Sequence, residues 1–364
     1  MRLRCERDTL VEALQTAGRA VSGRGGQLPV LSGLHLALEG DELVVTGSDL
    51  ELTIARTLTV NGEVDGSSVV PAKLLIDVVR SLEPGAIELD LTDLDLTIRG
   101  GRSDFSIRTI PTDEFPQLAS AEGPAVTLEA GSFVAALRQV VPAASGDDSR
   151  PILTGVLMTP VDVGLRLVAT DSYRLAVADI PGASVLEGDQ SVLVPSRALA
   201  EVRRVVGEAP ELTLRLGEND ASFEIEGLVV TTRLIDGDFP KYEGLIPSGP
   251  ANELAVNRET VLDAVRRVRL LAQESTPVRL VMNGDGLEIV AITQDVGEGH
   301  ETVDAVYTGD ELTVAFNPQF LLDGLDVAPG DDVTLQTIDS LKPAVLRTPG
   351  NEHFLYLLMP VRVP

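Results

Sequence analysis

The sequence predicts an α+β protein built from three tandem domains of one kind, each with two strand–helix–strand repeats. Three observations indicate this fold. Similar segments return at a period of roughly 120 residues. The strand segments alternate apolar and polar residues with period two, and each helical segment is short and amphipathic. Because such helices cannot bury their apolar stripe alone, we expect them to pack in pairs against flanking sheets.

The first repeated element is a strand that leads directly into a helix. Its three copies read LRCERDTLVEALQTAGRAV, LEAGSFVAALRQVVPAAS and LAVNRETVLDAVRRVRLLA. Leu14, Leu137 and Val265 occupy equivalent positions in these copies. Each domain is therefore expected to begin with a strand and a helix.

A second helix and two strand motifs recur at the same period. The helical segments are VVPAKLLIDVVRSL, VLVPSRALAEVRRVV and TVAFNPQFLLDGLDV, in which Pro71, Pro195 and Asn317 align. The motif LVVTGSDLELTIA matches LRLVATDSYRLAVA and, more weakly, LEIVAITQDVGEG, while FSIRTIPTDEFPQL matches VVTTRLIDGDFPKY. We therefore expect domains at 1–121, 125–248 and 251–364, joined by linkers rich in glycine and proline.

The charge of the chain is strongly acidic, with 29 basic and 56 acidic residues and a net charge of −27. Taken alone, this field would repel nucleic acid. The basic residues nevertheless concentrate on the non-core faces of the predicted helices. The second helices carry Lys73 with Arg80 and Arg197 with Arg204, whereas the third copy has Gln319 and Asp326 there. The first helices carry Arg7, Arg138, Arg258, Arg266 and Arg269.

Two interpretations of these basic faces stay open. They are either ordinary solvated helix surfaces with ion pairs, or one surface that attracts phosphates. Recurrence at equivalent positions favours the second interpretation. Such a surface would contact the nucleic-acid backbone without reading sequence. With 3% aromatic residues and no Trp, a stacking platform for single strands is not expected.

Catalytic and metal-binding patterns are missing from the sequence. His35, His300 and His353 are scattered, and no paired-cysteine spacing, P-loop or GxSxG motif occurs. The sequence therefore predicts a protein that is not an enzyme and has no cofactor or metal. The single cysteine, Cys5, is interpreted as a small buried side chain in a cytoplasmic protein, with no transmembrane helix and no secretory signal.

The repeated motifs resemble the bacterial DNA polymerase III β subunit family, the sliding clamps, over essentially the whole chain. The most specific matches are LVVTGSDLELTIA, LVATDSYRLAV, RLIDGDFPKY and the terminal YLLMPVR. The resemblance implies three DNA-clamp domains per chain, with helices lining a ring and sheets outside. It implies a head-to-tail homodimer, associated with the nucleoid, that encircles double-stranded DNA without sequence preference. It further implies the DNA polymerase III alpha subunit, an ATP-driven clamp loader complex, translesion polymerases, mismatch repair proteins and ligase as partners.

The resemblance also assigns candidate site residues by position. Arg24 and Arg150 would join the DNA-facing residues, and the ring interface would place Phe105 and Ile107 against Leu270 and Leu271. The pocket for partner peptides, an apolar cleft with polar anchors, would be formed by Leu153, Thr170, Ser172, Tyr173, Arg174, Leu175, Pro240, Leu245, Asn317, Phe320, Leu341, Leu357, Leu358, Met359, Pro360, Val361 and Arg362.

The chain departs from the family pattern near this pocket. Gly244, Ser275 and Pro343 replace a basic, an aromatic and a small polar residue, and Pro151 with Ile152 replaces an aromatic pair near the DNA-facing loop. These departures leave alternatives open. The chain could be a second, drug-insensitive clamp copy, a repeat-built interaction scaffold that never encloses DNA, or an enzyme whose active site the sequence does not reveal.

Overall fold

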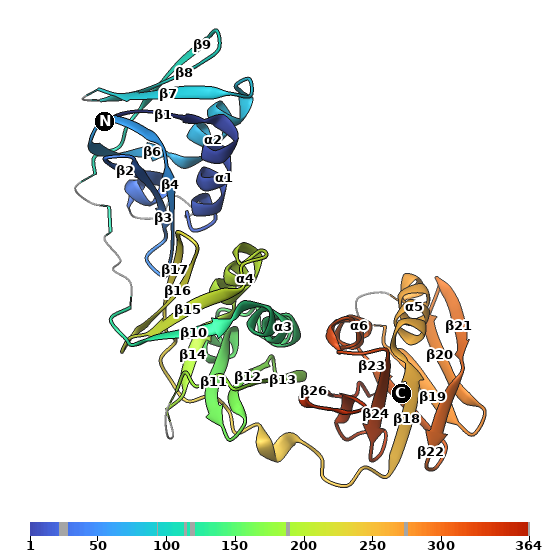
Figure 1. Ribbon diagram of the computed structural model, residues 1–364. Helices are drawn as coiled ribbons and strands as arrows, with labels where there is room; N and C mark the ends of the chain where they lie inside the picture. The colour runs from blue at the N-terminus through green and yellow to red at the C-terminus, as the bar shows by residue number, and fades with distance from the viewer. Residues whose placement is uncertain are drawn as a thin grey trace. The chain divides into compact units, whose positions relative to one another are not determined.

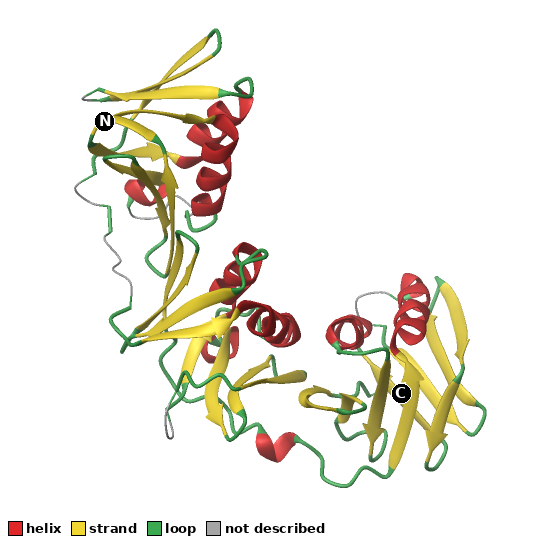
Figure 2. Cartoon of the chain, viewed as in Figure 1, coloured by secondary structure: helices red, strands yellow, loops and turns green. Residues whose placement is uncertain are grey.

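The α+β architecture is confirmed by the computed structural model, which describes residues 1–21, 28–92, 94–112, 115–116, 121–186, 190–272 and 276–362. Strands dominate and a few helices pack on them (Figure 2). The chain forms two compact units. Unit 1 consists of residues 1–131 and 200–234, and unit 2 consists of residues 132–199 and 235–364.

The six predicted helices are all present, at the predicted places in each copy. Pro71 and Pro195 directly precede the second helices of the first two copies, and the Asn317 side chain caps the third by accepting from the Gln319 and Phe320 N–H groups. The helices are α1 (Arg7–Gly18), α2 (Ala72–Ser81), α3 (Ala130–Val140), α4 (Ser196–Val205), α5 (Arg258–Val268) and α6 (Pro318–Val327).

Unit 1 contains two antiparallel sheets. The first has the order β5-β1-β7-β8-β9, and the second has the order β10-β15-β16-β17-β4-β3-β2-β6. Helices α1 and α2 lie side by side against them (Figure 1). The strands are β1 (Arg2–Glu6), β2 (Gly33–Glu39), β3 (Glu42–Ser48), β4 (Leu52–Thr59), β5 (Asn61–Val64), β6 (Gly66–Pro71), β7 (Ala86–Leu91), β8 (Asp95–Gly100), β9 (Ser103–Arg108), β10 (Ala125–Glu129), β15 (Glu211–Leu216), β16 (Asp220–Ile225) and β17 (Leu228–Arg233).

Unit 2 also contains two antiparallel sheets, with the orders β14-β11-β12-β13-β26-β25-β24-β18-β22 and β21-β20-β19-β23. Helices α5 and α6 pack together on this unit (Figure 1). The strands are β11 (Gly155–Val161), β12 (Gly164–Thr170), β13 (Arg174–Pro181), β14 (Val192–Pro195), β18 (Asn252–Asn257), β19 (Val278–Asn283), β20 (Gly286–Thr293), β21 (Gly297–Val303), β22 (Ala305–Thr308), β23 (Leu312–Phe316), β24 (Asp332–Thr337), β25 (Ala344–Thr348) and β26 (Asn351–Leu358).

Neighbouring copies share sheets through one strand pair each. In unit 1, β4 of the first copy pairs with β17 of the second, from Leu52 opposite Thr232 to Arg56 opposite Leu228. In unit 2, β13 of the second copy pairs with β26 of the third in the same antiparallel manner. The equivalent strands at the two remaining ends, β9 and β21, each pair with one neighbour and lie at sheet edges within the described chain. The third copy thus has a free β21, and the first a free β9.

Apolar periodicity explains the placement of the helices. In α1 the buried residues are Leu10, Ala13, Leu14 and Ala17, which is the spacing of one helical face. They join a core with strand residues such as Leu43. The helix amphipathicity that the sequence predicts therefore produces the observed helix-on-sheet packing.

Candidate functional site

The turn between β12 and β13 is the structural centre of the predicted partner pocket. Asp171 accepts hydrogen bonds from the Tyr173 and Arg174 N–H groups at 2.9 and 3.0 Å, and the Thr170 hydroxyl accepts from Ser172 N–H at 3.1 Å. These bonds hold Ser172 at a φ of 81°, a conformation that non-glycine residues rarely adopt. The turn therefore fixes the direction in which the Tyr173 and Arg174 side chains leave the sheet.

The same turn occurs in the first copy, between β3 and β4. There Asp49 accepts from the Glu51 and Leu52 N–H groups, Ser48 accepts from Leu50 N–H, and Leu50 has a φ of 79°. Since both turns follow the repeated motif with its shared aspartate, the sequence repeat extends to backbone geometry.

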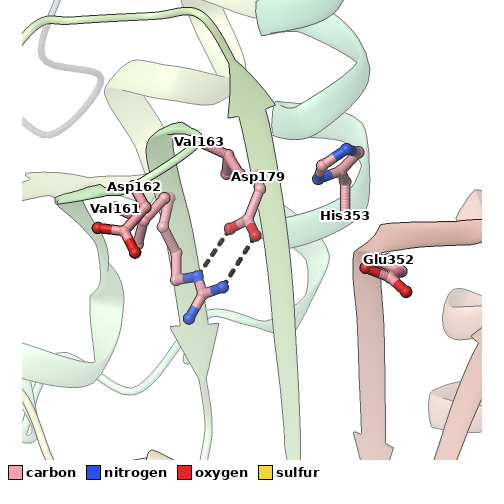
Figure 3. Close-up of a pocket in the computed structure, with 7 residues that line it drawn as sticks. Val161, Asp162, Val163, Asp179, Glu352 and His353 are labelled. Atoms are coloured by element: carbon pink, nitrogen blue, oxygen red, sulfur yellow. Dashed lines mark hydrogen bonds and ion pairs between the residues drawn. The ribbon is translucent and has the colours of Figure 1, made fainter.

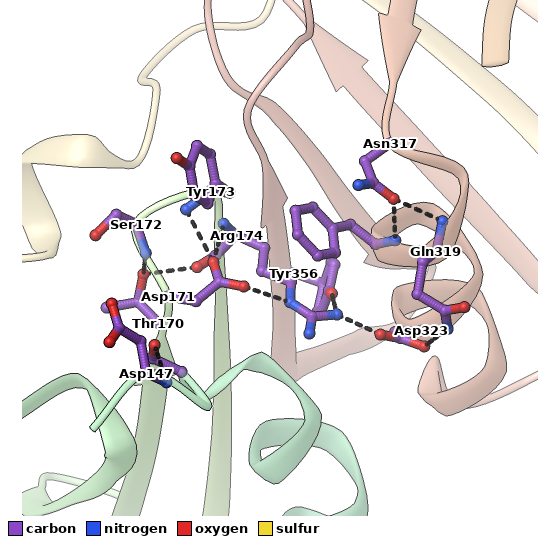
Figure 4. Close-up of polar contacts among 12 residues, drawn as sticks. Asp147, Thr170, Asp171, Ser172, Tyr173, Arg174, Asn317, Gln319, Asp323 and Tyr356 are labelled. Atoms are coloured by element: carbon purple, nitrogen blue, oxygen red, sulfur yellow. Dashed lines mark hydrogen bonds and ion pairs between the residues drawn. The ribbon is translucent and has the colours of Figure 1, made fainter. Parts of the chain in front are cut away.

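Arg174 lies buried at the centre of a polar network (Figure 4). Its guanidinium donates to Asp171 at 3.1 Å, to the Tyr356 hydroxyl at 3.2 Å, and to the Asp323 carboxylate. Asp323 also accepts from the Gln319 side chain of the same helix. Three acceptors around one guanidinium join β13 of the second copy to α6 and β26 of the third.

Aromatic rings cover this network on one side. The Arg174 guanidinium lies 4.4 Å from the centre of the Phe320 ring, and the Tyr173 ring stacks on Phe320 with centres 6.3 Å apart. Tyr173 is 60% exposed. Burial raises the pKa of the Tyr356 phenol, so this hydroxyl stays protonated at neutral pH.

The C-terminal tail runs along the same turn. The Met359 N–H donates to the Tyr173 carbonyl at 2.9 Å, and the Val361 N–H donates to the Ala315 carbonyl at 2.7 Å. Five apolar side chains on loops, the β12–β13 turn and the tail of unit 2 are exposed. We call this set the tail surface; it comprises Tyr173, Leu245, Leu341, Met359 and Val361.

Several predicted pocket residues are interior instead. Leu175 lies opposite Leu357 across the β13–β26 pair, and both belong to a buried cluster with Tyr242. Thr170, Arg174 and Leu358 are also buried, Leu153, Asn317, Phe320 and Pro360 are half-buried, and Ser172, Pro240 and Arg362 are exposed. The buried residues of this list are part of the interior, and the residues of the tail surface are accessible.

The sequence analysis missed four residues that build this region: Asp171, Tyr242, Asp323 and Tyr356. Asp171 and Tyr242 lie inside the recognised motifs LVATDSYRLAV and RLIDGDFPKY, so the motifs could have indicated them. Tyr356 likewise opens the recognised motif YLLMPVR. Asp323 carries no local signal, because its partner Arg174 is 149 residues away.

Arg150, predicted to face DNA, is held in the same network. Its guanidinium donates to Asp147 at 3.0 Å and to the Asp171 carbonyl and the Ser172 hydroxyl at 3.3 and 3.4 Å. This side chain therefore ties the loop before β11 to the turn. Of the neighbouring departures, Gly244 is exposed and Pro343 is half-buried. Arg24 and Ser275 lie outside the described residues.

The remaining helix arginines divide into two groups. Arg7 and Arg258 have side chains that are only 16% and 18% exposed, and they donate to the backbone carbonyls of Arg80 and Gly330. Both side chains therefore stabilise the fold by bonding backbone groups distant in sequence. The exposed group is Lys73, Arg80, Arg138, Arg197, Arg204, Arg266 and Arg269.

The four predicted ring-interface residues also differ in accessibility. Leu270 is 83% and Phe105 39% exposed, as an interface requires. Leu271 is half-buried, and its Cδ1 lies 2.9 Å from the place where a Cβ on Gly299 would stand. Ile107, by contrast, is 3% exposed because it packs into the core of unit 1. It supports β9 from within and offers no surface to a partner.

A separate polar cavity of about 470 Å³ lies at the β11–β12 turn (Figure 3). It is lined by Arg166 and Asp179, whose two-fold ion pair at 2.7 and 2.8 Å satisfies both groups, and by Asp162, Glu352 and His353. None of the predicted site residues lines it. The predicted pocket and this cavity are different places.

No three His, Cys, Asp or Glu side chains among the described residues gather closely enough to hold a metal ion. No helix among them has the length and apolar character that crossing a membrane requires.

Comparisons with known proteins match the whole chain. Family models described as the N-terminal, central and C-terminal domains of the DNA polymerase III beta subunit match residues 1–119, 127–241 and 243–362. The beta sliding clamps of Streptomyces coelicolor and Bacillus subtilis are 33% and 30% identical, over 100% of both chains. Solved clamp structures from Bacillus subtilis (TM-score 0.93, 28% identity) and Bartonella birtlesii (0.94, 31%, bound to griselimycin) cover 100% of both chains.

Proposed function

The chain belongs to the DNA polymerase III beta subunit family, and we propose that it works as a ring-shaped homodimer that encircles duplex DNA and tethers the replicative polymerase. The ring needs no active site, because topology rather than chemistry keeps it on DNA. Partner proteins, including the polymerase alpha subunit and a clamp loader, would bind the tail surface through short peptides.

The observation that carries this proposal is that β9 and β21 both lie at sheet edges in the described part of the chain. Two junctions between copies are continuous antiparallel strand pairs, β4–β17 and β13–β26. The matching strands at the ends of the series, β21 and β9, have an unpaired edge. Unpaired edges invite another strand. In the dimer, β21 of each chain would pair with β9 of the other chain. This contact occurs twice and closes the ring, as a cyclic head-to-tail dimer requires.

The internal junctions also give the register of that contact. Ile54 lies opposite Gly47 in the β3–β4 hairpin, and Gly299 lies opposite Ala291 at the equivalent place in β20–β21. Hairpins β16–β17 and β8–β9 both close on two-residue turns, so Val230 corresponds to Phe105. Since Ile54 lies opposite Val230, the same register puts Gly299 of one chain opposite Phe105 of the other chain.

This register fits the side chains. Gly299 has no side chain of its own, and Leu271, which packs over it, offers the exposed Phe105 ring an apolar contact. The same register sets Glu298 opposite Ser106 and His300 opposite Asp104, all exposed in the single chain. No core side chain has to turn outward.

The tail surface suits a peptide with apolar anchors. Tyr173, Leu245 and Met359 are exposed, and the thioether of Met359 adapts to irregular shapes. The Arg174 network below them is fully paired, so its charges are not available for recognition. Binding is therefore expected to depend on buried apolar area contributed by a few side chains.

The proposal is tested by loading the protein on nicked circular DNA with its clamp loader and then cutting the circle. The ring should stay on circles and leave linear ends, while a DNA-bound protein roadblock at both ends should restore retention. Equal retention on circles and open linear DNA would instead favour an interaction scaffold that does not enclose DNA.

A further inference from the structure

The second helices of the three copies carry one repeated charge pattern, and the third copy reverses its last member. The first two copies read basic, acidic, basic along one helix face, and the third reads amide, acidic, acidic. The equivalent residues are Lys73, Asp77 and Arg80 in α2, Arg197, Glu201 and Arg204 in α4, and Gln319, Asp323 and Asp326 in α6.

The central acidic residue is used structurally in the later copies. Glu201 accepts from Arg19 of the first copy at 3.3 Å, and Asp323 accepts from Arg174 of the second. These contacts explain an acidic residue in the middle of a basic face. They do not explain Asp326, which is one helical turn further on and 56% exposed.

Asp326 instead lies against a basic residue of the neighbouring helix. Its carboxylate accepts from the Arg266 guanidinium at 3.2 Å, and Asp263 accepts from the same guanidinium at 3.3 Å. The side chains of Arg266 and Asp326 remain about half exposed. One cation therefore faces two anions on the exposed face of the α5–α6 pair.

Two other arginines of α5 are engaged elsewhere. Arg258 donates to backbone carbonyls, and Arg267 forms a bidentate ion pair with Glu301 at 2.8 and 3.0 Å. Arg269, which directly follows α5, is exposed and is the other basic residue of this copy's predicted DNA-facing set. In the first two copies, by contrast, the position equivalent to Asp326 is basic. It is Arg80 or Arg204, and each of these arginines pairs with one acidic residue of its own helix.

We propose that Asp326 is a counter-charge that makes the third domain the weak-holding segment of the DNA-lining surface. This inference rests on the proposed function, in which these helices face the duplex. By pairing with Arg266, Asp326 removes one phosphate contact per chain. It also adds repulsion close to the DNA backbone. Phosphate attraction is thereby left to the first two domains, and the ring keeps low friction as it slides.

A purely structural role for this ion pair is a poor explanation of its placement. Exposed pairs contribute little to stability. Helices α5 and α6 already pack against each other, and Val265 of α5 and Leu321 of α6 are buried. The charge is best explained by what it does to an approaching anion.

The test compares Asp326→Asn, which removes the charge, with Asp326→Arg, which restores the pattern of the other copies. Rings loaded on DNA are followed by single-molecule diffusion between about 50 and 200 mM salt. Each chain regains one phosphate contact, which makes two per ring. The friction of sliding then depends more steeply on salt, and it rises by up to about tenfold at the low-salt end of this range. Friction at low salt should be higher for Asp326→Arg than for Asp326→Asn. At high salt the diffusion of both variants should approach that of the wild type.

Two controls separate the possible outcomes. Asp285→Asn removes the same charge at the β19–β20 turn and should diffuse like the wild type. Arg266→Gln should change little alone but cancel the effect of Asp326→Asn, which is the coupling expected of one interacting pair. Unchanged diffusion of both Asp326 variants at every salt, with normal retention on circles, would overturn this inference alone. Loss of wild-type retention on circles would overturn the proposed function.

Discussion

The Arg174 guanidinium on β13 donates to the Asp323 carboxylate on α6, and this contact links the second and third copies directly beneath the tail surface. Both side chains are mostly buried, and Tyr356 and Asp171 complete the set of acceptors. The accessible apolar residues above are thus carried by a rigid polar base.

Replacing Arg174 with Ala should destabilise unit 2. The substitution leaves Asp171 and Asp323 without their cation, and breaking a buried pair costs about 3 kcal/mol. Calorimetry should show the loss as a lower melting temperature. Arg80→Ala, which removes an exposed arginine that pairs with Asp77, should cost at most about 1 kcal/mol. Equal losses in the two variants would contradict the buried network.

Deleting residues 359–364 should strongly weaken partner binding without affecting assembly. The deletion removes the Met359 and Val361 side chains and leaves β26 intact. A peptide from the polymerase alpha subunit should bind at least about tenfold more weakly. Val306→Ala, at an exposed position on β22, is the matched control. Unchanged affinity after the deletion, with the dimer intact by sedimentation, would show that the site lies elsewhere.

The ring contact can be checked by disulfide formation. A double variant, Glu298→Cys with Ser106→Cys, places the two thiols opposite each other across the proposed β21–β9 pair, about 5 Å apart at Cβ. Oxidation should give a covalent dimer. Glu298→Cys with Arg108→Cys is displaced by two residues, at about 7–8 Å, and should link poorly. Preferential linking of the displaced pair would refute the register.

The native cysteine should not interfere with that experiment. Burial raises the pKa of the Cys5 thiol to about 12, so almost none of it is thiolate at pH 8.

Acid should weaken unit 1 through His35. Burial lowers the pKa of this imidazole below its ordinary value of 6.5, and its ring stacks on Phe115 with centres 5.0 Å apart. The unfolded chain binds the proton more tightly, so the stability contributed by neutral His35 is present above pH 6.5 and is lost as pH falls below it. The melting-temperature gap between wild type and His35→Gln should therefore narrow from pH 7 to pH 5.5. A constant gap for His35→Gln would contradict the assignment.

The sequence could predict what depends on local pattern. Six helices follow from apolar spacing and from Pro71, Pro195 and Asn317 before the second helices, and the family follows from its motifs. It could not predict contacts between distant residues, such as Arg174 with Asp323. Nor could it show that Ile107 faces inward or that Arg258 binds backbone carbonyls, because residue type alone does not reveal which neighbour a side chain reaches. The tail was expected to line a pocket, and the structure adds which of its residues are accessible.

The most direct measurement of encirclement uses the Glu298→Cys, Ser106→Cys double variant loaded on covalently closed circular DNA and then oxidised. Two disulfides turn the dimer into a covalent ring linked to the circle. Protein and circle should then migrate together in denaturing detergent, and cutting the circle or reducing the disulfides should release the protein. Release from intact circles despite complete dimer cross-linking would contradict encirclement.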